Sequence, residues 1–334
     1  MSTLLADVGG TNVRFALADP QASMPLLADT IRRYRVADFP TFTDAARHDL
    51  ADAQARPTHA VFAFAGPVTG NIVHITNHPW TVELSRVRSD LGLGDLRALN
   101  DFAAMSLSVS LLAENEVDAI GAARPAVIGG AAQQTFAIIG PGTGLGVGAL
   151  IVREGQIHTL ESEGGHLSFA PRNDFEIEIL RRLAVRFGRV SNERLLCGAG
   201  LVNLYNVLAE IDAVAIDVLE PQDITARAES GDVRCVRCVH VFCDLLGAAA
   251  GDLVLGFGAW DGVYLSGGLT PRLQPWLHAG AFRKRFEDKG RFAGRLASVP
   301  TLAVLHADAG LLGTAARAVL DAGGTLAQRS GLPI

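Results

Sequence analysis

The stretch Leu4–Leu17 constrains the fold of this chain more than any other. An apolar run contains Asp7, and an alternating apolar segment that carries Arg14 follows the four turn residues Gly9, Gly10, Thr11 and Asn12. Two strands joined by a glycine turn predict a β-hairpin. Glycines adopt backbone angles closed to other residues and let the main chain approach a ligand, and successive N–H groups in such a turn can bind an anion. We therefore predict that the hairpin receives a phosphate and that Asp7 holds its metal ion, with an ordinary connecting turn as the alternative.

Composition excludes several classes of protein. With 334 residues, 49% of them hydrophobic and 19% charged, the chain is long enough for two globular domains. A net charge of −6 without long single-sign runs argues against a nucleic-acid partner. No basic region precedes the first apolar run and no uninterrupted apolar stretch reaches membrane length, so we expect neither a signal peptide nor a membrane partner. Four cysteines make no disulfide framework in so long a chain, which favours a reducing cytoplasm.

The chain has only two lysines, Lys284 and Lys289, and neither lies in a glycine loop. The P-loop pattern G-x-x-x-x-G-K-[ST] and the strand lysine of protein kinases are therefore both absent. Any phosphate bound here must be held by backbone amides, an arginine and a metal ion.

The first third of the chain alternates strands with helices. After the hairpin we predict strands over Thr30–Val36, Thr58–Ala65, Asn71–Ile75 and Asp95–Leu99, and helices over Phe39–Gln54 (capped by Thr41 or Thr43), Val82–Leu91 and Phe102–Leu112. This order favours a mixed sheet with crossover helices. Asn100 and Asp101 follow the last of these strands, where α/β sheets bind ligands. Asp101 is therefore a candidate catalytic acid or base, with helix N-capping as the alternative.

The second half of the chain repeats the pattern of a strand, a glycine turn and a returning strand. A predicted strand over Gln134–Gly140 leads into the turn Gly142, Thr143 and Gly144, and Leu145–Val152 returns. A third glycine turn, Ser266-Gly267-Gly268, follows a strand over Asp261–Leu265. The other predicted elements are a strand over Thr301–His306 and helices over Asp174–Phe187, Asn192–Leu196, Gly200–Glu210, Asp232–Phe257 and Gly310–Leu320. Three glycine turns after apolar strands, with Asp7 and Asp101 near strand ends, indicate a nucleotide held between two related α/β domains.

These motifs carry a resemblance. D-V-G-G-T-N-V-R-F-A-L, T-N-H-P-W, L-N-D-F-A-A, G-P-G-T-G-L-G-V, E-G-G-H, S-N-E-R-L-L-C-G-A-G-L and L-S-G-G-L, in this order, resemble those of bacterial ATP-dependent glucokinases over nearly the whole chain. The resemblance implies an α/β protein with the two-domain actin-like (ribonuclease H-like) ATPase fold, with mixed sheets, flanking helices and a cleft between the domains. It also implies a small domain of residues 1–111 plus 312–334 and a large domain of residues 112–311.

The resemblance also implies a role for each matching residue. Asp101 corresponds to the general base that takes the proton of the sugar 6-hydroxyl. The implied glucose ligands are Asn100, Glu163, His166, Glu193 and the less certain Asn77. Asp7 is expected near the metal, Gly9, Gly10, Thr11, Asn12, Arg14, Gly142, Thr143 and Gly144 around the phosphates, and Gly267 and Gly268 beside the adenosine. The implied substrate and cofactors are glucose, ATP and Mg²⁺, and the implied assembly is a homodimer.

The chain departs from the family at two places. Pro141 stiffens the second phosphate turn, and H-A-D-A-G at residues 306–310 stands where an asparagine is expected, so the nucleotide contacts of that stretch are not carried over. A second hypothesis keeps the fold and changes the sugar, to mannose, fructose or an N-acetylated hexosamine. A third is a sugar sensor without turnover, against which stand the retained Asp101 and the lack of a helix-turn-helix before the first strand.

A zinc site is a further alternative. Cys235, Cys238, His240 and Cys243 lie close together in the sequence but within one apolar helical pattern, where they do not converge on a point. A core helix with ordinary thiols is the favoured interpretation.

Overall fold

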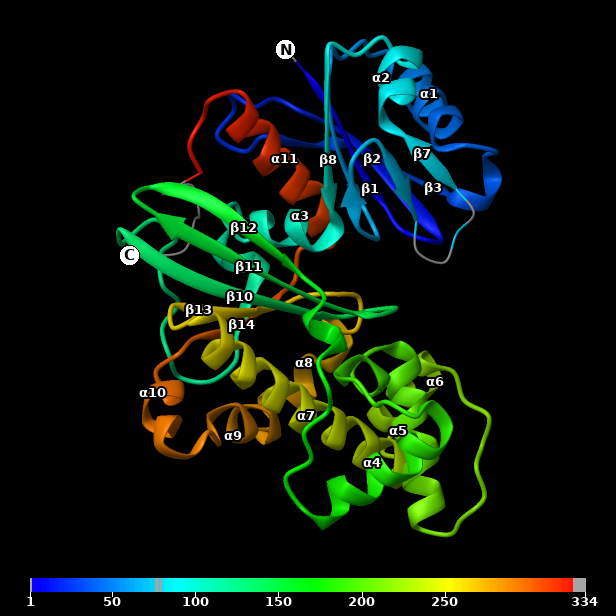
Figure 1. Ribbon diagram of the computed structural model, residues 1–334, viewed down its shortest axis with the longest axis vertical. Coiled ribbons are helices and arrows are strands. Elements are labelled where there is room, and N and C mark those ends of the chain that lie inside the picture. The colour runs from blue at the N-terminus through cyan, green and yellow to red at the C-terminus, as the bar shows by residue number, and fades with distance from the viewer. Residues whose placement is uncertain (1, 76–77, 79, 327–334) are drawn as a thin grey trace.

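The computed structural model describes residues 2–75, 78 and 80–326 (Figure 1). Two large β-sheets, one from each half of the chain, form its frame. The first has the order β3-β2-β1-β4-β8, with β1 (Thr3–Val8), β2 (Asn12–Ala18), β3 (Leu26–Arg35), β4 (His59–Phe64) and β8 (Asp95–Asn100). The second has the order β12-β11-β10-β13-β14-β9, with β9 (Val117–Ala119), β10 (Gln133–Pro141), β11 (Leu145–Arg153), β12 (Gln156–Ser162), β13 (Gly262–Leu265) and β14 (Thr301–Val304).

The two large sheets share a common strand topology. In each, the first three strands form an antiparallel meander that begins with a glycine hairpin, and the next two strands are parallel to the first. The second sheet has one extra edge strand, β9, antiparallel to β14. This shared order confirms the expected pair of related α/β units. A small third sheet comprises β5 (Val68–Thr69), β6 (Ile72–His74) and β7 (Thr81–Glu83).

Helices cover the sheets in layers (Figure 1). On one side of the first sheet a core of side chains from β1, β2 and β4 includes Phe42 of α1 (Phe42–Ala53) and Val87 of α2 (Leu84–Asp90). Between the two sheets lie α3 (Asp101–Ser108) and α11 (Ala309–Asp321), in a core shared by Leu5 of β1 and Ile138 of β10. The far side of the second sheet carries α4 (Asp174–Phe187), α5 (Gly198–Ile211), α6 (Pro221–Glu229), α7 (Val233–Phe257), α8 (Thr270–His278), α9 (Ala281–Glu287) and α10 (Ala293–Ala297).

Local sequence signals place most of these elements, and the structure corrects a few. Thr41 caps α1, with its hydroxyl accepting the N–H of Asp44 at 3.2 Å, as predicted. Residues 82–83 belong to strand β7, and the helix predicted over Asn192–Leu196 is only a short 3-10 turn at Asn192–Arg194. The helix predicted to reach Leu112 ends at Ser108. Strands β5, β9 and β12 and helices α6, α8 and α10 were not predicted.

Helix α7 is the one described helix long and apolar enough to cross a membrane, yet 67% of its most apolar window is buried within the protein. Cys235, Cys238 and Cys243 are buried on it, and the His240 ring packs edge-on against Trp276. Among the described residues no group of three or more His, Cys, Asp or Glu is arranged to hold a metal ion. The helix is a core element, and these residues do not form the zinc site considered as an alternative.

Helix α3 sits unusually close to the strands of the second sheet. A Cβ atom added to Gly146 of β11 would lie 1.7 Å from the ring of Phe102, and one added to Gly148 would lie 2.7 Å from Ser106 Oγ. On its other side α3 meets α11, where a Cβ on Gly313 would lie 1.7 Å from the carbonyl oxygen of Ala104. Glycines on both neighbours therefore let α3 pack at backbone distance between them.

We predict that Gly146→Ala destabilises the fold by about 3 kcal/mol, because the new methyl group overlaps the Phe102 ring and α3 must shift. The matched control is Gly256→Ala near the end of α7, where a Cβ meets nothing within 4 Å. That substitution should stabilise by about 0.5 kcal/mol through helix propensity. Urea unfolding followed by circular dichroism measures both, and equal stabilities of the two variants would contradict this packing account.

Candidate active site

The first glycine hairpin places a cation beside a carboxylate. Asp7 and Arg14 are partners in the β1–β2 register, and Arg14 Nη1 donates to Asp7 Oδ2 at 2.8 Å. Gly9 N–H donates to the carbonyl of Asn12 at 2.9 Å, which closes the turn that contains Gly10 and Thr11. Thr11 and Asn12 are exposed. Gly9 has no positive φ. The prediction that it supplies a special backbone angle is therefore wrong, and close approach of the main chain is what its missing side chain offers.

Asp7 lies against the first turn of α11. A Cβ on Gly310 would lie 2.7 Å from Asp7 Cγ, so only glycine leaves room for the carboxylate. Burial raises the pKa of Asp7, while the charge and hydrogen bond of Arg14 act in the opposite direction. Mg²⁺ in phosphate-transfer sites is commonly held by one or two carboxylates together with substrate phosphates. Asp7 beside a phosphate-type turn therefore fits such an ion, although no larger metal cluster exists among the described residues.

Asn100 and Asp101 divide two tasks at the junction of β8 and α3. Asn100 is the N-cap: its Oδ1 accepts the N–H groups of Phe102 at 2.8 Å and Ala103 at 3.3 Å, and its Nδ2 donates to the carbonyl of Gly66 at 3.1 Å. Asp101 is the first helical residue, and its Oδ1 accepts the Phe102 N–H at 2.9 Å. The capping role weighed for Asp101 thus belongs to Asn100.

The environment of Asp101 raises its pKa to about 7. Loss of hydration is the largest cause, the negative charge of Asp7 adds to it, and Glu163 contributes further, against the stabilising Phe102 N–H. These couplings bring three candidate residues from different elements into one electrostatic unit. A carboxylate whose pKa is near 7 can accept a proton at physiological pH and is a stronger base than an ordinary aspartate.

Glu163, His166 and Glu193 come together next to the second hairpin. Glu163 follows β12 and precedes the 3-10 turn Gly164–His166, and Glu193 lies in the 3-10 turn Asn192–Arg194. His166 Nε2 lies 3.9 Å from Glu163 Oε2 and 3.9 Å from Glu193 Oε1. Glu163 and His166 are exposed, with 75% and 54% of their side chains accessible, so their polar groups are available to a ligand. Carboxylates and an imidazole suit the many hydroxyls of a sugar.

The second and third glycine turns adjoin this cluster. Glu193 Oε2 accepts the N–H of Leu145 at 2.9 Å, and a Cβ on Gly144 would lie 2.6 Å from the same oxygen. Gly142 N–H donates to the carbonyl of Gly144 at 2.8 Å across the exposed Thr143.

Gly267, with φ of +83°, packs so closely on the backbone of Pro141 that a Cβ would lie 2.5 Å from its carbonyl oxygen. Gly268 is exposed, with open space where a Cβ would be. The second and third glycine turns therefore lie against each other.

Two charged residues that the sequence analysis left without a role complete the site. Asp308, just before α11, lies 3.5 Å from Arg14 Nε, and Arg33 Nη2 donates to both of its oxygens at 2.7 and 2.8 Å. The only signal in the sequence was the unexpected aspartate in H-A-D-A-G. Asn77 lies outside the described residues.

Comparisons with known proteins all point to one family. The Glucokinase family model matches residues 4–320. The chain is 52% identical to the glucokinase of Stenotrophomonas maltophilia K279a over 94% of both chains, and 52% identical to that of Xanthomonas oryzae pv. oryzae MAFF 311018 over 95% of this chain and 94% of the relative.

Solved structures give the same fold. The glucokinase of an Antarctic psychrotroph superposes with a TM-score of 0.84 at 33% identity, covering 95% of this chain and 98% of that one. A ROK-family glucokinase from Streptomyces griseus, solved with glucose and AMPPNP, shares the fold at 20% identity with a TM-score of 0.63, over 94% of this chain and 98% of that one. The chain therefore belongs to the glucokinase family.

Proposed function

We propose that the chain transfers the γ-phosphate of ATP to the 6-hydroxyl of glucose, giving glucose 6-phosphate and ADP. The observation that carries this proposal is Asp101, whose pKa of about 7 is raised by burial and by the charges of Asp7 and Glu163. Asp101 thus interacts electrostatically with Asp7 of the first glycine hairpin and with Glu163 of the cluster that suits a sugar. The names of the relatives at 52% identity support the same substrates.

In the sugar site, Glu163, His166 and Glu193 accept and donate hydrogen bonds to the glucose hydroxyls. Asn100 adds the second N–H of its side-chain amide, because its Oδ1 caps α3 and its other N–H donates to Gly66. Asn77 is a further proposed ligand. Because these groups lose partners when a hydroxyl is missing or inverted, the site discriminates against sugars that leave a carboxylate unpaired.

In the transfer step, Asp101 accepts the proton of the 6-hydroxyl as the oxygen attacks the γ-phosphorus. A bond forms between this oxygen and the phosphorus, and the bond from the γ-phosphorus to the bridging oxygen of ADP breaks. Such transfers need positioning and charge neutralisation more than covalent help. Asp101 is partly buried at the start of α3, a helix that packs between α11 and the glycines of β11, and this position limits the water that would otherwise accept the phosphate.

The phosphates are held by backbone amides and one cation. We assign the turn amides of Gly9, Gly10, Thr11 and Asn12 with Arg14, and those of Gly142, Thr143 and Gly144, to the β- and γ-phosphates, and Gly267 and Gly268 to the adenosine side. Asp7 would hold Mg²⁺, which supplies charge neutralisation on the phosphates when it is bound. Arg14 is the fixed cation that the lysine-poor sequence requires.

We further propose a small domain of residues 1–111 plus 312–334 and a large domain of residues 112–311. The packing of α11 against α3, β1 and β4 supports grouping it with the first sheet. A cytoplasmic homodimer is the expected state of the protein.

The assay of glucose 6-phosphate formation from glucose and ATP, with wild type beside Asp101→Ala, tests the proposed function. Wild type should turn over, and the variant should lose about 10³-fold in kcat, the range of a general base, while it still binds glucose. Glucose binding without turnover in wild type would favour a sensor. Turnover with another hexose in preference to glucose would change the assigned sugar.

The raised pKa of Asp101 predicts a cost to stability. A carboxyl group whose pKa is higher in the folded than in the unfolded state holds its proton more tightly when the protein is folded. The stability of the wild type therefore falls as the pH rises from about 4 to about 7, and this group causes no further loss above pH 7. Asp101→Asn escapes this loss and should be more stable than wild type by about 2 kcal/mol at pH 8, after allowance for solvent screening. Denaturant unfolding at pH 5 and pH 8 measures the difference, which should shrink at pH 5; a difference that is equal at both pH values would refute the shift.

Glu193→Gln should weaken glucose binding selectively. Loss of a charged hydrogen-bond partner is expected to raise the KM for glucose roughly 10- to 100-fold and to leave the KM for ATP within about threefold. Glu161→Gln is the matched control, because Glu161 is exposed on β12 just before the cluster. Equal effects of both variants on glucose would remove Glu193 from the sugar site.

A further inference from the structure

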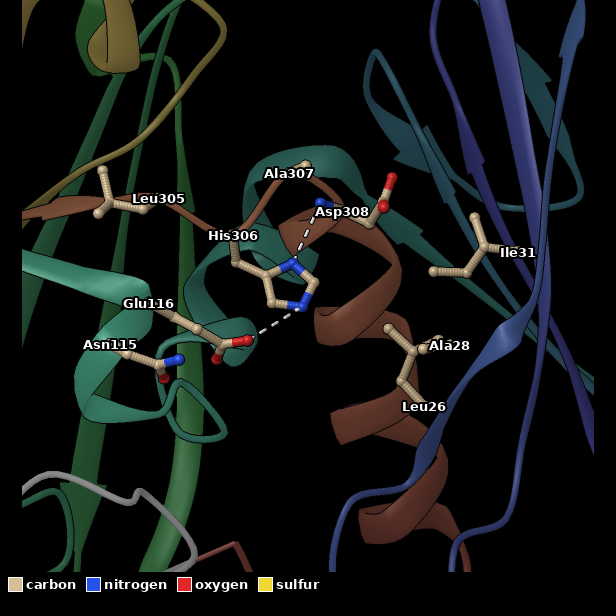
Figure 2. A pocket seen from close by; sticks show the side chains of 9 residues that line it. All are labelled: Leu26, Ala28, Ile31, Asn115, Glu116, Leu305, His306, Ala307 and Asp308. Carbon is tan, nitrogen blue, oxygen red and sulfur yellow. Dashed lines mark hydrogen bonds and ion pairs between the residues drawn. The ribbon is translucent and has the colours of Figure 1, made fainter.

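Asp308 is held where the chain crosses from the second sheet to α11. Figure 2 shows it at the start of that helix, at the edge of a pocket of about 370 Å³ between β3 and residues 305–308. Its N–H donates to His306 Nδ1 at 3.1 Å, and His306 Nε2 lies 3.6 Å from Glu116 Oε1. The side chain of Asp308 is only 11% exposed, and Arg33 Nη2 contacts both carboxylate oxygens. Hydrogen bonds therefore hold both the backbone N–H and the carboxylate of Asp308.

Arg14 lies between two carboxylates. Its Nη1 donates to Asp7 at 2.8 Å, while its Nε is 3.5 Å from Asp308 Oδ1. That Nε atom is buried and has no hydrogen-bond partner within the described residues. Because a guanidinium does not lose its charge in proteins and this Nε atom is buried, a carboxylate beside it stabilises Arg14 in every state of the site.

The two carboxylates flank the same helix terminus. Asp308 precedes the first residue of α11, and Asp7 packs against Gly310 in its first turn. The positive end of a helix stabilises anions there. If Asp7 ligated a metal ion, its hydrogen bond to Arg14 would weaken, and Asp308 would be the anion that stays beside Arg14.

We propose that Asp308, held by Arg33, is a positioning residue of the phosphate site: it anchors the Nε side of Arg14 so that the guanidinium faces the phosphates once Asp7 turns to the metal ion. This inference rests on the proposed function. A carboxylate repels phosphate and offers no N–H donor, so Asp308 acts on the arginine and not on the nucleotide.

Calorimetric binding of Mg·ATP and of adenosine to the full chain separates these roles. Asp308→Ala should weaken Mg·ATP roughly tenfold, the effect of one charge-assisted hydrogen bond, and leave adenosine within about twofold. Asp308→Asn keeps the shape and loses the charge, so it should weaken Mg·ATP nearly as much. In steady-state kinetics the KM for ATP should rise, with the KM for glucose unchanged.

Arg33→Met provides a second variant, because the Arg33 side chain is 57% exposed and its removal should not prevent folding. It should weaken Mg·ATP about threefold. Arg97→Met is the matched control: Arg97 is 52% exposed and lies 3.7 Å from Asp321 at the opposite end of α11, so its loss should leave Mg·ATP binding unchanged.

Unchanged Mg·ATP affinity in folded Asp308→Ala, or equal losses for adenosine and Mg·ATP, would overturn the inference. The selective loss for Mg·ATP would support it even if wild type fails to phosphorylate glucose, which would overturn only the proposed function. A wild-type chain that binds no Mg·ATP would overturn both.

Discussion

The packing of α3 against glycine backbone is the contact on which the rest of the site depends. On one side the Phe102 ring fills the space that a side chain at Gly146 would occupy, and on the other Ala104 touches Gly313 of α11. Both distances are possible only where a Cβ atom is missing. Asp101 begins the helix held in this way, while α11 brings Gly310 against Asp7 and places Asp308, which precedes it, beside Arg14. One close-packed layer thus fixes the positions of the charged groups from both halves of the chain.

That layer also sets the electrostatics. Enclosing Asp101 removes its water, and the neighbouring charge of Asp7 further disfavours ionisation, so the pKa rises toward neutrality. Asp7 is itself balanced by Arg14, and Arg14 is shared with Asp308 and, through it, with Arg33. Asp7, Asp308, Arg14 and Arg33 thus form a cluster without net charge beside the first glycine turn.

Local patterns in the sequence were sufficient to predict the two hairpins, the cap of α1 and most of the strands along the chain, because each of these depends on residues a few positions apart. Spacing could not show that Glu163 and Glu193 meet through His166; family resemblance supplied that expectation. The sequence places Gly140, Gly146 and Gly148 on the predicted strands of the second hairpin, and it gives no sign that they accommodate α3. The link from Asp308 to Arg33 joins residues 275 positions apart, so only the folded chain reveals it.

Burial raises the pKa of Asp101 to about 7, and the proposed role of Asp101 as a base poised near neutral pH depends on that value. The most direct test is a ¹³C NMR titration of aspartate carboxyl groups, with the Asp101 signal assigned by its absence from Asp101→Asn. The account predicts a titration midpoint at about pH 7. A midpoint near pH 4, the value of an ordinary aspartate, would contradict it.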